Sequence, residues 1–188
     1  ILEAPFFDPK ADDAANYGAI GAVIGHEVSH GFDNLGSEFD ADGRLKNWWT
    51  KEDAAHFKAA TDKLVAQYDA YEALPGLKLS GKQTLGENIA DVAGLQAAYT
   101  AYHASLGGKP APVIDGLSGD ERFFLAFAQA WRAKQRDAAL RAQVIGDGHA
   151  PARFRALTVR NIDAWYDTFK VKDGAKLYLK PEERVKIW

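Results

Sequence analysis

The sequence has 188 residues, a net charge of −3 and no cysteine. A hydrophobic share of 47% with a charged share of 26% is typical of a globular domain with a real core, and excludes a disordered chain. The acidic balance and the lack of a basic block give no support for nucleic-acid binding. The absence of cysteine excludes disulfides and thiolate ligands, so any metal must be held by histidine and carboxylate side chains.

The first predicted helix begins at a cap on Asp13 or Asn16 and ends at about Phe32, because apolar residues recur at helical spacing. Its glycines, among them Gly25, weaken it intrinsically, and they make sense if another backbone packs closely on that face. The apolar run 18–25 is too short to span a bilayer, and this segment predicts no membrane contact. Residues 1–10 lack the features of a signal peptide, and the start without methionine indicates a chain cut from something longer.

The rest of the chain also predicts helices, and the fold class is mainly α. Thr50 with Asp53, and Ser118 with Glu121, are capping boxes that mark helix starts. We expect helices over 51–71, 85–106 and 121–135, a short polar helix within 132–148, and a last helix over 154–169. We expect loops over 75–81 and 107–119, and a turn-rich connection over 146–154.

The stretch Ile24–Asp33, IGHEVSHGFD, holds two of the five histidines. On a helix, His26 and His30 lie one turn apart on one face, so both imidazoles can reach one metal ion. Glu27 is rotated away from them but stays close enough to accept a proton from a water at the metal. A surface helix with two incidental histidines is the alternative, so a third ligand is needed.

The stretch TLGENIADVAG supplies a third ligand. Glu87 can complete a His₂Glu zinc site with one position open to water, and Asp91, four residues later on the same face, can accept the free N–H of a ligating histidine. The alternative is that Thr84 and Glu87 form a capping box, which needs no metal. Pairing with the HEVSH motif favours ligation.

Three further polar residues have weaker signals. His149, in a turn, can donate a hydrogen bond to the oxyanion that forms when water attacks a carbonyl, and Arg155 can hold a substrate carbonyl. Asp33 can accept a hydrogen bond from a ligating histidine. Each is also an ordinary residue for a surface turn or a helix end.

Several motifs together resemble one family in order and spacing. They are APFF at 4–7, NYGAIGAVIGHEVSHGFD, GRLKNWWT, TLGENIADVAGL, FFLAFAQAW, GHAPARFR and Trp188. The sequence resembles the neprilysin-like zinc metallopeptidases, which include endothelin-converting enzymes and bacterial endopeptidases, over essentially its whole length.

The resemblance implies a thermolysin-like (gluzincin) catalytic region that binds one Zn²⁺. In it, His26, His30 and Glu87 match the zinc ligands, Glu27 the general base and Asp91 the carboxylate that orients a ligand histidine. His149 matches the transition-state stabiliser and Arg155 the substrate anchor. Val23 and Trp131 match positions near the pocket for the residue after the scissile bond.

The resemblance also implies a fragment of a larger two-lobed enzyme. Residues 1–188 correspond to the C-terminal catalytic domain, without the N-terminal lid domain and the edge strand that holds the substrate backbone. We expect a zinc-dependent endopeptidase that cleaves oligopeptides on the amino side of hydrophobic residues, with peptides and the missing N-terminal domain as partners. The alternatives are a non-catalytic zinc-binding or interaction fragment and a metallo-aminopeptidase. The absence of cysteine leaves the compartment open and favours a bacterial periplasmic or extracellular protein over a cytoplasmic one.

Overall fold

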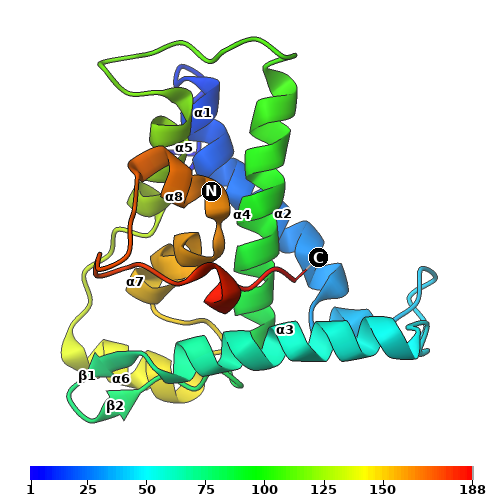
Figure 1. The fold of residues 1–188 in the computed structure, drawn as a ribbon. Helices are drawn as coiled ribbons and strands as arrows, with labels where there is room; N and C mark the ends of the chain where they lie inside the picture. Colours follow the sequence, from blue (N-terminus) through cyan, green and yellow to red (C-terminus); the bar gives the residue numbers. More distant parts are fainter. Residues whose placement is uncertain (188) are drawn as a thin grey trace.

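A computed structural model describes residues 1–187, so Trp188 lies outside the described residues. Helices dominate the fold and confirm the prediction of a mainly α chain (Figure 1). The α-helices are α1 (Asp13–Asn16), α2 (Ala22–Ser29), α3 (Lys51–Asp69), α4 (Leu85–Ser105), α5 (Gly119–Ala130), α6 (Asp137–Gly146), α7 (Ala152–Arg155) and α8 (Asp163–Phe169). The strands β1 (Glu72–Leu74) and β2 (Leu77–Lys78) form an antiparallel hairpin.

The first helical segment runs without a break over the predicted range. A π-helical stretch (Tyr17–Gly21) joins α1 to α2, and a 3₁₀ turn (His30–Phe32) ends the segment. The predicted cap was wrong, because Asp12 caps α1 by accepting a hydrogen bond of 3.0 Å from the Ala14 N–H. Asp12 has extended backbone dihedrals, which suit an N-cap, so its side chain can turn back to the first free N–H groups.

Helix α3 begins as predicted and ends slightly earlier. The Thr50 hydroxyl accepts from the Asp53 N–H at 3.1 Å, which confirms Thr50 as the cap, while the Asp53 carboxylate bonds the Thr50 hydroxyl at 2.6 Å rather than completing a capping box. The hairpin β1–β2 was not predicted, and its second strand and its turn lie within the predicted loop 75–81. Its turn depends on Gly76, whose φ of +75° is readily adopted only by glycine.

Helix α4 matches its prediction, and the alternative of a Thr84–Glu87 capping box at its start is excluded. The Thr84 hydroxyl donates to the Ser80 carbonyl at 3.1 Å and accepts from the Asn88 amide at 2.8 Å. No capping hydrogen bond joins Thr84 to the start of α4, so Glu87 does not complete a capping box. By contrast, Ser118 and Glu121 form the predicted capping box of α5, a helix that ends at Ala130 rather than near residue 135.

The prediction of one continuous helix over 154–169 is wrong, because the structure has two helices with a break between them. Helix α7 is followed by a 3₁₀ segment (Ala156–Asn161), and Ile162 is extended before α8 begins. The break places the Asn161 side chain between α3 and the C-terminal tail, where it exchanges two hydrogen bonds with Gln67 and accepts one from the Val185 N–H. These contacts are non-local, so the local sequence pattern does not reveal the break.

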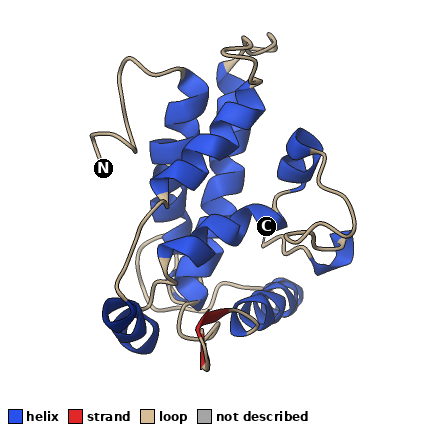
Figure 2. Ribbon diagram, turned by 90° about the vertical axis from the view of Figure 1, so that its left-hand side faces the viewer, coloured by secondary structure: helices blue, strands red, loops and turns tan. Residues whose placement is uncertain are grey.

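Helix α4 lies between two hydrophobic clusters. Leu95, Ala98 and Tyr102 pack with residues of α1, α2, α5 and the segment before α8, whereas Ile89 and Val92 pack with residues of α3, α7 and the C-terminal tail. Figure 1 shows α4 among the other helices, and Figure 2 shows the strands of the hairpin, in red, at one edge. No described helix combines the length and the apolar character that crossing a membrane requires.

Candidate metal centre

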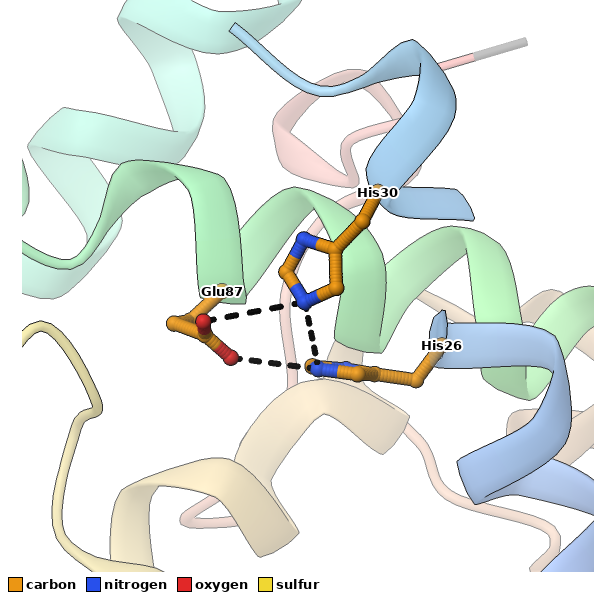
Figure 3. A group of neighbouring side chains, drawn as sticks. All are labelled: His26, His30 and Glu87. Atoms are coloured by element: carbon orange, nitrogen blue, oxygen red, sulfur yellow. Dashed lines mark hydrogen bonds and ion pairs between the residues drawn. The ribbon is translucent and has the colours of Figure 1, made fainter. Parts of the chain in front are cut away.

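Three side chains from two helical segments converge on one point. His26 lies in α2, His30 begins the 3₁₀ turn that follows α2, and Glu87 lies in the first turn of α4 (Figure 3). The Nε2 atoms of the two histidines are 3.0 Å apart, and Glu87 carboxylate oxygens lie 3.1 Å from His26 Nε2 and 3.6 Å from His30 Nε2. Among the described residues, this is the group of histidine and acidic side chains whose geometry suits a metal ion.

The other ring nitrogen of each histidine faces a buried aspartate. His26 Nδ1 donates to Asp91 at 2.8 Å, and His30 Nδ1 donates to Asp33 at 2.7 Å. A carboxylate only accepts hydrogen bonds, so both Nδ1 atoms carry the proton. Each neutral imidazole then has its lone pair on Nε2, where the two rings meet Glu87.

This arrangement fits a zinc ion. Two Nε2 lone pairs and a carboxylate repel one another at these distances unless a cation or a proton lies between them. Glu87 Oε2 is also buried without a hydrogen-bond partner, and such an atom needs a compensating interaction. Two imidazoles and one carboxylate form the His₂Glu donor set of catalytic zinc sites, which leaves a fourth position for water or substrate.

The pKa shifts of these side chains also indicate that the centre favours positive charge. Burial lowers the pKa of His26, but the neighbouring Asp91 and Glu87 carboxylates outweigh this effect and raise it to about 9. Burial raises the pKa of Glu87, and the neighbouring His26, His149 and His30 bring it below its usual range. Without metal, a proton on His26 compensates the carboxylates, and a divalent cation would replace that proton.

His149 reaches the same centre from the connection between α6 and α7. Its Nε2 lies 3.1 Å from Glu87 Oε2. Asp147 orients the ring, because its Oδ1 accepts from His149 Nδ1 at 2.8 Å and from the His149 N–H at 2.9 Å. The imidazole therefore presents Nε2 to the centre.

Arg155, at the end of α7, also holds Asp91, and its Nη2 lies 3.4 Å from His26 Nδ1. Its guanidinium donates two hydrogen bonds to Asp91, at 2.9 and 2.7 Å, and stacks 4.1 Å from the Trp131 ring centroid. Although burial alone raises the pKa of Asp91, hydrogen bonds from His26 and Arg155 keep it below its usual range. Asp91 is therefore ionised at neutral pH and can polarise His26.

A cavity of ≈ 190 Å³ adjoins the centre. Glu27, which is exposed on the surface of α2, lines this cavity together with His149 and Arg155. The apolar walls come from Ile1, Phe6, Ala19, Ala22, Val23, Phe127, Ala130 and Trp131. The cavity thus has polar groups beside the metal ligands and an apolar side.

The structure places every candidate site residue of the sequence analysis in or beside this centre. The ligand candidates His26, His30 and Glu87 meet, and the remaining seven surround them or line the cavity. Asp33 had only a weak signal, three residues after His30, and Asp147 was not anticipated. The available signal for Asp147 was local: an aspartate two residues before a histidine in a glycine-rich turn can bond its ring.

Comparison with known proteins places the chain in a family. The model of peptidase family M13 matches residues 1–185. The neutral endopeptidase of Lactobacillus helveticus is 43% identical over all of this chain and 27% of its own length, and endothelin-converting enzyme 1 of Mus musculus is 37% identical over all of this chain and 25% of its own length.

Solved structures that resemble this chain support the same family assignment. The Mycobacterium tuberculosis zinc metalloprotease Zmp1, in complex with an inhibitor, has a TM-score of 0.96 and 49% identity, over 100% of this chain and 30% of that one. PepO from Lactobacillus rhamnosis has a TM-score of 0.87 and 37% identity, over 100% of this chain and 28% of that one. The chain therefore spans less than a third of these relatives. From its motifs, its fold and these matches, the chain belongs to peptidase family M13, the neprilysin-like zinc metallopeptidases.

Proposed function

We propose that this chain is the zinc-binding part of an endopeptidase that hydrolyses oligopeptides. The observation that carries the proposal is the convergence of His26, His30 and Glu87 beside a cavity that also contains Glu27 and His149. One zinc ion is the proposed cofactor. When bound, it makes a water nucleophilic near neutral pH and polarises the scissile carbonyl.

Glu27 is the proposed general base. Glu27 follows His26 by one residue, so it lies off the helix face that carries the two histidine ligands. It lines the cavity next to His26, so it can reach a water there without acting as a ligand. It accepts a proton as the water attacks the peptide carbonyl and then delivers that proton to the leaving amine.

His149 and Arg155 are the proposed electrostatic partners of the substrate. With Nδ1 bonded to Asp147, His149 can donate through Nε2 to the developing oxyanion once it is protonated there. Arg155 is fixed by Asp91 and Trp131 at the cavity wall, where the unused part of its guanidinium can bind a substrate carbonyl.

A preference for cleavage on the amino side of hydrophobic residues is part of the proposal. Its support is the apolar side of the cavity, to which Val23 and Trp131 contribute. An apolar side chain that enters this cavity is removed from water, which favours binding by about 25 cal/mol per Å² of buried apolar area.

The test uses the zinc-loaded protein and an internally quenched peptide blocked at both ends, with a hydrophobic residue after the intended cleavage site. We expect cleavage that a chelator abolishes and zinc restores. Glu27→Gln should keep stoichiometric zinc and lower kcat by about 10²- to 10⁴-fold, the usual contribution of a general base. An active Gln variant would remove Glu27 from this role.

A non-catalytic zinc-binding fragment is the second candidate. It is favoured by the coverage, since the chain matches only about a quarter of its relatives' length and the remaining part can contribute substrate contacts. In this case the protein binds one zinc ion but cleaves no peptide until the rest of the protein is supplied. An aminopeptidase would instead cleave only peptides with a free amino terminus, so the blocked peptide separates this alternative as well.

A further inference from the structure

Helices α2 and α4 make backbone contact at Gly25 and Gly94. A Cβ atom on Gly25 would lie 2.5 Å from the Gly94 carbonyl oxygen, and one on Gly94 would lie 2.3 Å from the backbone nitrogen of His26. Ordinary van der Waals contacts begin at 3.4 Å, and the atoms met here belong to the main chain. A side chain at either position would therefore have to move a helix by roughly an ångström.

These two glycines lie beside the metal-site residues of their helices. Gly94 follows Glu87 by seven residues and Asp91 by three, so the three share one face of α4. Gly25 immediately precedes His26. The point of closest helix approach therefore lies beside the same face that carries a ligand carboxylate and the carboxylate that orients His26.

The side chains that cross between the helices are short and depend on this spacing. Asp91, with a single methylene group, reaches His26 Nδ1 at 2.8 Å, and Glu87 reaches His26 Nε2 at 3.1 Å. Helices in ordinary packing have axes about 8–10 Å apart, and glycine contacts allow the lower end of this range or less. Metal sites tolerate changes of only about 0.2 Å in ligand distance, so a shift of roughly an ångström cannot be absorbed by the bonds alone.

We propose that Gly25 and Gly94 are positioning residues, whose backbone contact sets the spacing of α2 and α4 at which Glu87 and the two histidines close on one zinc ion. The proposal rests on the proposed zinc site and adds what determines its geometry. Other glycines at close helix contacts, by contrast, are needed for the stability of the fold and not for the geometry of the zinc site.

Gly18 is the matched control. It lies in the same continuous helical segment, and a Cβ atom there would meet a main-chain atom equally closely, 2.1 Å from the Phe123 carbonyl oxygen. This contact is with α5 and not with α4. Gly18→Ala and Gly94→Ala therefore introduce similar steric strain, away from and at the metal-site crossing respectively.

The experiment compares wild type, Gly18→Ala, Gly25→Ala and Gly94→Ala. Zinc affinity is measured by competition with a chromogenic chelator, and coordination geometry by the visible absorption of the cobalt(II)-substituted protein. We expect Gly25→Ala and Gly94→Ala to bind zinc about 10- to 100-fold more weakly, the size of effect seen when the supports of metal ligands are disturbed. Their cobalt bands should shift or weaken. Gly18→Ala should lower the thermal midpoint of the metal-free protein but keep its zinc affinity within about twofold and its cobalt spectrum unchanged.

Equal zinc affinities and spectra in Gly18→Ala and the two crossing variants would overturn the proposal. If wild type itself binds no zinc, the proposed zinc site fails first, and this outcome is recognised before any variant is compared. Variants are prepared in saturating zinc, because ligand binding stabilises the folded state and helps a strained variant to fold.

A longer side chain at position 91 tests the spacing without introducing a clash at the glycines. At a fixed spacing, Asp91→Glu has one methylene too many and should weaken zinc binding by more than about tenfold. In the Gly94→Ala background, where the helices stand further apart, Asp91→Glu should weaken zinc binding by a smaller factor than in wild type. This difference is a measurable coupling between the two sites. A neutral Asp91→Glu in the wild-type background would show that the helices adjust freely, and would contradict the proposal even if Gly94→Ala fails to fold.

Discussion

Each metal-facing imidazole is bonded through its second nitrogen to an aspartate, His26 to Asp91 and His30 to Asp33. Asp33 does more than accept from His30. Its other oxygen accepts from the Leu35 and Gly36 N–H groups, at 2.7 and 2.8 Å, and so fixes the turn that follows the helix. The ring of His30 is therefore held by a carboxylate that is itself held by the backbone.

Asp33→Asn should weaken zinc binding by about 10- to 100-fold. The asparagine oxygen can keep the turn, which leaves the NH₂ group facing His30 Nδ1. Two donors cannot pair, so the imidazole would move its proton to Nε2 and lose the lone pair that ligates. Chelator competition measures the affinity. Asp40→Asn, in the exposed turn 40–44, is a control, and an Asp33→Asn affinity equal to that of the control would contradict this role.

At the scale of single residues, the sequence predicts what depends on local spacing. His26 and His30 share a face because they are four residues apart on a helix, and this requires no knowledge of the fold. Glu87 becomes their neighbour only through the crossing of α2 and α4, so the segment around Thr84 left two alternatives open. The structure decides between them, since Thr84 bonds Ser80 and Asn88 and does not cap α4.

At the scale of elements, the C-terminal tail is fastened to α8 through Asp163. This residue begins the helix, and its carboxylate pairs with Lys186 at 2.6 Å and Arg184 at 2.8 Å. Hydrogen bonds from Lys186 and Arg184 lower the pKa of Asp163, against a smaller opposing effect of burial. Arg184 also lies over the Tyr166 ring, 3.5 Å from its centroid, so the contact joins the tail to the core.

The lowered pKa of Asp163 sets the direction of a pH effect. A carboxylate with a folded-state pKa below its unfolded value of about 3.9 stabilises the fold above that pH, and the stabilisation is lost as the pH falls through the folded-state pKa. Because the group is partly exposed, Asp163→Asn should lower the free energy of unfolding at pH 7 by at most about 1 kcal/mol.

Urea unfolding at several pH values measures this effect. The difference between wild type and Asp163→Asn should shrink below pH ~4. Asp167→Asn, one turn later on α8, is the control and should show a smaller effect. A wild-type advantage that persists unchanged at low pH would contradict the role of this ion pair.

The helices that the sequence predicts well are those with a capping residue of their own or a clear helical periodicity of apolar residues. Helices α3, α4 and α5 begin at the predicted residues, within one or two positions. The hairpin and the break before Ile162 were missed. The break depends on Asn161, whose side chain bonds Gln67 on α3 and Val185 in the tail, and such distant partners leave no local signal.

At the scale of the whole molecule, the described surface carries exposed apolar side chains on and after α2. Val28, Leu35 and Leu45 are exposed by 67%, 65% and 73%. Ile24, Phe32, Phe39 and Trp48 are further exposed residues of the same stretch. Apolar surface of this extent is a feature of interaction sites or of association-prone proteins.

We expect residues 1–188 alone to self-associate through this stretch. Replacing Leu35 and Leu45 together with glutamate should shift the weight-average mass toward the monomer in sedimentation velocity, because charges on the surface oppose apolar association. Val113→Glu changes an equally exposed residue in another loop and is the control. A concentration-independent monomer mass for wild type would refute this expectation.

The central claim is that α2 and α4 bring two imidazoles and the Glu87 carboxylate to one zinc ion. Metal analysis of Glu87→Ala after gel filtration tests it most directly, beside wild type and Glu121→Ala, which removes a glutamate from the capping box of α5. We expect one zinc ion per chain in wild type and in Glu121→Ala. In Glu87→Ala we expect a zinc affinity more than about 100-fold weaker, a larger loss than for a residue that only supports a ligand. Stoichiometric zinc in Glu87→Ala, held as tightly as in wild type, would contradict it.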